Sequence, residues 1–85
     1  MDDTRANNTV DSRASFVEFV ALLRQDFLKS PNSWENNTLE SFLEALGRYA
    51  EDIQGYYDNC EAGVNADEPS WQNFANILRG ASMYE

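Results

Sequence analysis

Three stretches of this chain place apolar residues at helical spacing, and each begins beside a residue type that caps helices. They cover residues 13–29, 38–57 and 70–83. Apolar residues three or four positions apart line one face of a helix, whereas no stretch of useful length alternates like a strand. The sequence therefore predicts an all-α fold, a small bundle of three main helices.

Each predicted helix has an apolar face. In the first helix the face comprises Phe16, Phe19, Val20, Leu23 and Phe27. In the second it comprises Leu39, Phe42, Leu43, Leu46, Tyr49, Ala50, Ile53 and Tyr57, and in the third Trp71, Phe74, Ala75, Ile77, Leu78 and Ala81. The first helix also has a second apolar strip, which predicts that it touches two neighbours or contributes to a dimer: Val17, Ala21 and Leu28.

Local signals predict where these helices begin and end. The candidate caps are Asp11 or Ser12, Asn37 or Thr38, and Ser70. A break is expected at Ser30-Pro31, and Gly55 is expected to end or kink the second helix. Gly80 could end the third helix early, whereas Gly47 could let another element approach. We expect residues 1–10 to form a flexible arm and residues 11–85 a single helical domain.

Two tryptophans lie at or just before helix starts. Trp34 precedes the second helix, and Trp71 opens the third. We expect each to plug an end of the core, in the manner of a hydrophobic staple, in preference to binding a ligand.

The negative charge is concentrated in one segment. Residues 35–68 hold nine acidic residues and one base, Arg48, and account for −8 of the net charge of −9. Phosphate contacts need clustered Lys and Arg, so this balance argues against nucleic acid and against anionic membranes as partners. It favours a basic protein partner, or it serves only solubility.

The side chains that usually carry catalysis are scarce. The chain has no histidine to activate a nucleophile, and one cysteine, Cys60, cannot form an internal disulfide. The loop 58–69 has the length of a calcium loop but lacks oxygen ligands where that geometry needs them. We therefore expect no enzyme, no metal and no cofactor. The single thiol and the absence of a visible signal peptide or membrane-spanning run favour a cytoplasmic protein.

The tyrosine pair Tyr56-Tyr57 is the best interface candidate in the sequence. Tyrosine is enriched at binding hot spots, and this pair lies among acidic residues. The predicted partner-binding residues are Glu51, Asp52, Tyr56, Tyr57, Asp58 and Glu61. In the alternative interpretation, Tyr57 closes the core and Tyr56 lies half-exposed at the end of the helix.

Ordered motifs give the chain a family resemblance. They are Trp34-Glu35-Asn36, Leu39-x-x-Phe42-Leu43-Glu44-Ala45-Leu46, Gly55-Tyr56-Tyr57, Pro69-Ser70-Trp71-x-x-Phe74-Ala75-x-x-Leu78 and Ala81-x-x-Tyr84-Glu85. Over residues 10–85 this pattern resembles a family of small acidic bacterial proteins classed as a domain of unknown function. The resemblance implies a stand-alone helical domain and no activity.

A looser similarity, in size, charge and helical architecture, is to nuclease-colicin immunity proteins. Those proteins present a tyrosine pair near acidic residues to a basic toxin. Here Gly55 precedes the pair and Asp58 follows it, where that family has a proline.

Two hypotheses follow from the sequence. The first is a non-enzymatic acidic protein-binding module, an immunity-type inhibitor of a basic bacterial protein. The second is a structural or self-associating domain whose acidity serves only solubility. Under either hypothesis we expect a monomer or a weak homodimer.

Overall fold

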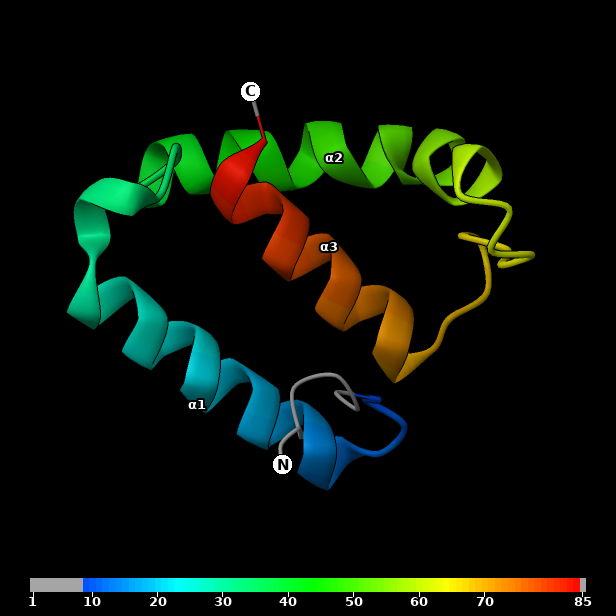
Figure 1. Cartoon of the computed structure of the whole chain (residues 1–85), viewed down its shortest axis with the longest axis horizontal. Helices are drawn as coiled ribbons and strands as arrows, with labels where there is room; N and C mark the ends of the chain where they lie inside the picture. The colour runs from blue at the N-terminus through cyan, green and yellow to red at the C-terminus, as the bar shows by residue number, and fades with distance from the viewer. Residues whose placement is uncertain (1–8, 85) are drawn as a thin grey trace.

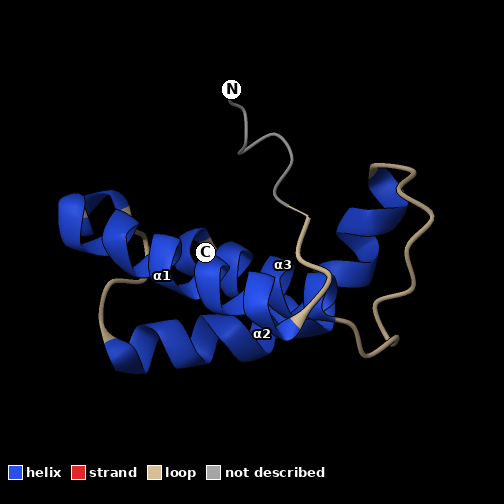
Figure 2. Cartoon of the chain, turned by 90° about the horizontal axis from the view of Figure 1, so that it is seen from below, coloured by secondary structure: helices blue, strands red, loops and turns tan. Residues whose placement is uncertain are grey.

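The computed structural model describes residues 9–84 and places them in three α-helices and one short 3₁₀ helix (Figure 1). Helix α1 spans Arg13–Lys29, η2 spans Pro31–Ser33, α2 spans Leu39–Asn59 and α3 spans Trp71–Met83. The described residues contain no strand (Figure 2). The predicted all-α fold with three main helices is confirmed.

Side-chain caps set the three helix starts. The hydroxyl oxygens of Ser12, Thr38 and Ser70 each accept a hydrogen bond of 3.1 Å from the backbone N–H three residues on. Each bond satisfies one of the N–H groups that a helix leaves without a partner at its first turn. Of the alternatives that the sequence offers, Ser12 and Thr38 are the caps.

Helix α2 continues through Gly55, which neither ends nor interrupts it, and closes at Asn59. Two backbone bonds close its end, from the Ala62 N–H to the Tyr57 carbonyl at 3.0 Å and from the Glu61 N–H to the Asp58 carbonyl at 3.1 Å. This is the Schellman arrangement, in which the residue after the cap adopts a left-handed conformation, usually as glycine. Here that residue is Glu61, with φ 54°.

Helix α3 lies between the other two helices (Figure 1). It packs against both α1 and α2, whereas no Cα atoms of α1 and α2 approach within 8 Å of each other in the described residues. A buried cluster of Val10, Phe19 and Ala75, flanked by Phe16, Leu23 and Leu78, joins α1 to α3. The buried side chains of Ala45, Ile53 and Ala81 lie on α2 and α3.

The apolar face of α2 is only partly used. Ala45, which the predicted face omits, is buried, while Leu39 and Leu43 of that face are 74% and 54% exposed. Ala50 is also exposed. The reason is that α3 covers one side of the face and α1 does not reach the other.

The N-terminal segment joins the core at Val10. Its side chain is buried, and its N–H donates a 2.7 Å hydrogen bond to the Gln72 Oε1 atom. The remainder of the predicted flexible arm, residues 1–8, lies outside the described residues. None of the described helices is both long and apolar enough to span a membrane.

Candidate functional site

The two tyrosines of the predicted site point in different directions from α2. Tyr57 is half-buried: its hydroxyl donates to the Asn73 Oδ1 atom at 2.7 Å and accepts from the Asn76 Nδ2 atom at 2.9 Å. Tyr56 is 44% exposed. Consecutive helical residues differ by about 100° around the axis, so the two rings leave α2 in different directions. Tyr57 thus ties α2 to α3, and Tyr56 remains on the surface.

Tyr56 belongs to a cluster of three tyrosines. Its ring centroid lies 5.3 Å from that of Tyr49 and 6.3 Å from that of Tyr84, and the Tyr49 and Tyr84 centroids are 5.1 Å apart. These separations are within the range of favourable aromatic pairs. The Tyr84 hydroxyl donates a hydrogen bond to the Asp52 carboxylate, which brings a predicted acidic residue to the cluster.

Asn36 holds the C-terminal end of the chain in place beneath this cluster. Its side-chain amide donates to the carbonyls of Ala81 at 2.9 Å and Tyr84 at 2.6 Å. Its backbone N–H donates to the Ser82 carbonyl at 3.1 Å. These bonds satisfy carbonyls that the last turn of α3 leaves without helical partners. Tyr84 is therefore positioned by a residue nearly fifty positions earlier in the chain.

The surface beside the cluster is hollowed. A depression of about 310 Å³ is lined by Asp52, Gly55, Tyr56, Asn59 and Tyr84. The guanidinium carbon of Arg48 lies 5.8 Å from the centroid of the Tyr84 ring, within the distance for a cation–π contact. We call Asp52, Tyr56 and Tyr84, with the depression between them, the tyrosine–aspartate surface.

Two tyrosine pKa values are raised in this region. The hydrogen bond to the Asp52 carboxylate raises the pKa of Tyr84 to about 12, because ionisation would place two negative charges together. Burial, followed by the neighbouring Tyr56, raises the pKa of Tyr49. Both hydroxyls therefore remain protonated donors at neutral pH.

The other predicted acidic residues surround the end of α2. Glu51, Asp58 and Glu61 are all exposed. The Gln54 amide group donates to the Asp58 Oδ1 atom at 3.1 Å and to the Val64 carbonyl at 2.9 Å, and its Oε1 atom accepts from the Ala66 N–H at 2.7 Å. Gln54 therefore holds the acidic loop against α2.

Asn73 holds the same loop against α3. It is buried, and its amide donates to the Asn65 carbonyl at 3.1 Å and the Glu68 carbonyl at 2.8 Å. Within residues 9–84, no three Cys, Asp or Glu side chains gather closely enough to hold a metal ion. The side-chain amides of Gln54 and Asn73 together hold the loop between α2 and α3 in place.

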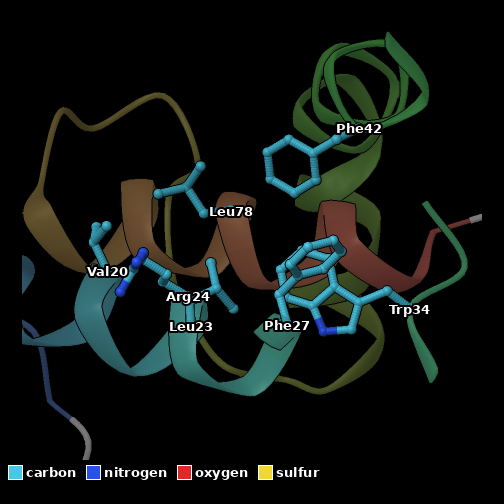
Figure 3. Close-up of a pocket in the computed structure, with 7 residues that line it drawn as sticks. All are labelled: Val20, Leu23, Arg24, Phe27, Trp34, Phe42 and Leu78. Atoms are coloured by element: carbon cyan, nitrogen blue, oxygen red, sulfur yellow. The ribbon is translucent and has the colours of Figure 1, made fainter. Parts of the chain in front are cut away.

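A second candidate surface is an apolar hollow between α1 and α2 (Figure 3). It has a volume of about 310 Å³ and is lined by Val20, Leu23, Arg24, Phe27, Trp34, Phe42 and Leu78. Trp34 closes one end: its ring centroid is 5.1 Å from Phe27 and 6.0 Å from Phe42, and its Nε1–H donates to the Asp26 carboxylate at 2.8 Å. Trp34 thus packs between Phe27 of α1 and Phe42 of α2, at an end of the helical domain, as the sequence predicts.

A family model for a family of unknown function, DUF7660, matches residues 12–85. The chain belongs to this family. The match begins at Ser12, the cap of α1, and so includes all three α-helices of this chain. No curated protein and no solved structure matches the chain. Membership of a family of unknown function is confirmed, whereas bacterial origin and the immunity-protein similarity stay predictions.

The motif residues of this DUF7660 chain have identifiable structural roles. Asn36 binds the end of α3, Ser70 caps its start, and Ala75 is 1% exposed in the core. Sequence reasoning placed Asp52 and Tyr56 in the candidate site but did not bring Tyr49 or Tyr84 to them. The sequence signal for the position of Tyr84 is the apolar character of Met83 and Tyr84, which predicts that this tail folds back onto the helices.

Proposed function

We propose that this chain is a non-enzymatic, acidic protein-binding module of the immunity type, which holds a basic bacterial protein in the cytoplasm. The tyrosine–aspartate surface would make the central contact. The exposed carboxylates of Glu51 and Asp58, on the other side of α2, and of Glu61, in the loop that follows, would add long-range attraction.

The observation that carries this proposal is the placement of Tyr56 and Tyr84 beside Asp52. Two amphipathic rings next to a carboxylate suit a lysine or arginine side chain, which can lie over a ring while its charge meets the acid. The Arg48 guanidinium already lies over the Tyr84 ring at 5.8 Å, so this ring accepts a cation within the chain itself. Tyrosines of this kind are frequent binding hot spots.

The charge distribution supports the same kind of partner. With −8 of the net charge in residues 35–68, a basic protein would be steered toward α2 and the loop that follows it. Steering of this kind raises the association rate more than it lowers the dissociation rate. The tyrosines would then determine how long the complex lasts.

The backbone at Glu61 gives independent support. A non-glycine residue with φ 54° is disfavoured, and glycine would meet the conformation at lower cost. Strained backbone positions concentrate at functional sites. The exposed carboxylate at this position, in the loop that follows α2, would be available to the same basic partner.

The test is capture of basic proteins from an extract of the source cells by the immobilised chain, followed by affinity measurement. Replacing Glu51 and Asp58 with lysine (E51K/D58K) should slow association and weaken capture. The matched control D11K/E18K changes net charge equally at exposed positions outside residues 35–68. Tyr56→Ala should weaken binding of the captured protein by about thirtyfold or more. Failure to capture any basic protein, or equal loss in both double variants, would contradict the proposal.

Self-association is the second candidate function. It is favoured by a different observation, the uncovered apolar hollow between α1 and α2.

A further inference from the structure

Gly55 forms part of the floor of the depression in the tyrosine–aspartate surface. It lies on the same stripe of α2 as Asp52, Tyr56 and Asn59, because residues three, four and seven positions apart share one face of a helix. All four of these residues line the depression. A Cβ built at Gly55 would meet no atom within 4 Å, so the space above the helix backbone is open there. The depression is therefore open because residue 55 has no side chain.

The rings of Tyr56 and Tyr84 stand beside this floor. Their planes make an angle of 78°, with the centroids 6.3 Å apart, and both residues line the depression. Tyr56 is 44% exposed. A group that enters the depression therefore meets aromatic surface from two elements, α2 and the segment that follows α3.

Two side chains with oxygen acceptors flank Gly55 along the helix. Asp52 lies one turn before it and Asn59 one turn after it, and both are exposed. The Tyr84 hydroxyl donates a hydrogen bond to the Asp52 carboxylate, which holds that carboxylate at the edge of the depression. An occupant lying over Gly55 thus has an anionic acceptor at one end and an amide oxygen at the other.

These features match a guanidinium group better than an ammonium group. A guanidinium is planar, stacks on aromatic faces and has five N–H donors that point outward in its plane, whereas an ammonium is a compact, strongly hydrated point charge. The chain itself contains such a contact, because the guanidinium carbon of Arg48 lies 5.8 Å from the centroid of the Tyr84 ring. Arg48 is not among the residues that line the depression.

We propose that the depression binds one arginine side chain of the basic partner. The guanidinium lies over Gly55, donates to the Asp52 carboxylate and the Asn59 amide oxygen, and packs against the rings of Tyr56 and Tyr84. This inference rests on the proposed function and adds to it the residue type that is recognised and the place where it binds. Gly55 is then a specificity-determining residue, since a side chain at this position would occupy the arginine site.

The first test is an NMR titration of the isotope-labelled full chain with three capped tripeptides, Gly-Arg-Gly, Gly-Lys-Gly and Gly-citrulline-Gly. The arginine peptide should shift the amide signals of Gly55, Tyr56 and Asn59 saturably, at a severalfold lower concentration than the lysine peptide. The citrulline peptide has a similar shape without the charge and should leave these signals in place. Equal affinity for the arginine and lysine peptides, or no saturable shift with the arginine peptide, would overturn the proposal.

The second test fills the depression. Gly55→Gln should abolish the shifts caused by the arginine peptide and weaken binding of the captured protein by about thirtyfold or more. Glutamine has a better helix propensity than glycine, so we expect this variant to fold. Gly47→Gln is the matched control, because Gly47 is also an exposed glycine of α2 whose built Cβ meets no atom within 4 Å, but it does not line the depression. Equal loss in the two variants would contradict the arginine site.

The arginine site and the proposed function can fail separately. Failure to capture any basic protein contradicts the proposed function. A captured basic protein that binds Gly55→Gln as tightly as the wild type contradicts only the arginine site.

Discussion

The absence of a side chain at Gly80 allows α3 to approach α2 closely. A Cβ built at this glycine would overlap the ring of Tyr49, and the backbone of α3 continues as helix beyond it to Met83. At Gly47 and Gly55 a Cβ would meet no atom within 4 Å. Close approach is therefore the role of Gly80, not of Gly47, and Gly80 does not end the helix.

Gly80→Ala should lower the free energy of unfolding by about 1–2 kcal/mol. Overpacking costs about 1–3 kcal/mol, and the better helix propensity of alanine offsets up to about 1 kcal/mol of it. Gly47→Ala, in the open helix position, should raise stability by about 0.5–1 kcal/mol. Urea denaturation of the two variants measures both changes; stabilisation by Gly80→Ala would mean that Tyr49 does not occupy that space.

The hydrogen bond between Tyr84 and Asp52 predicts one late tyrosine ionisation. The pKa of Tyr84 is about 12 in the folded chain against 10.0 unperturbed. The stabilisation from this pair is therefore complete below pH 10 and is lost as the pH rises from 10 through 12. Absorbance titration of phenolate should show this ionisation last, and Asp52→Asn should move it toward 10. A titration unchanged by Asp52→Asn would exclude the contact.

At the level of elements, the C-terminal end of α2 is the strained position. The left-handed conformation of Glu61 is one that glycine adopts at lower cost. Because of this, Glu61→Gly should raise the free energy of unfolding by about 1 kcal/mol. The neighbouring change Ala62→Gly should instead destabilise by about 0.5–1 kcal/mol through unfolded-chain entropy. Thermal or urea unfolding distinguishes them, and equal effects of the two changes would contradict the assigned geometry.

The helices themselves could be predicted because their signals are local. Capping hydroxyls and apolar periodicity placed α1 at its observed ends and α2 and α3 within two residues of theirs. The contacts between helices were not predictable in the same way. Periodicity shows that Leu43 and Phe42 share a face, but not that α1 stays too distant to cover Leu43.

Less of the candidate site could be predicted, because part of it depends on contacts between helices. Asp52 and Tyr56 lie one turn apart on a single helix, so the sequence places them together. Tyr84 reaches them only because Asn36 fixes the end of α3. The position of Tyr57 agrees with the alternative interpretation, in which it packs toward the core, because its hydroxyl forms hydrogen bonds with Asn73 and Asn76 of α3.

For the molecule as a whole, the contrast between the packing of α1 and of α2 determines which parts are held together most firmly. The contact between α2 and α3 is more extensive than that between α1 and α3. Among the helices of residues 9–84, α1 contacts only α3 and η2. The acidic loop joining α2 to α3 is also fastened by Gln54 and Asn73. The hairpin of α2 and α3 is thus the most connected part of the fold.

Cooperative unfolding should therefore begin by the departure of α1 as a unit. In native-state hydrogen exchange, amides in the middle of α1 should exchange faster than those in the middle of α2, through an opening that costs less free energy than global unfolding. Uniform protection of all three helices would contradict this order. Because α1 is attached mainly through α3, its amides would report the first loosening of the molecule under mild denaturant, before the protection of the α2–α3 hairpin changes.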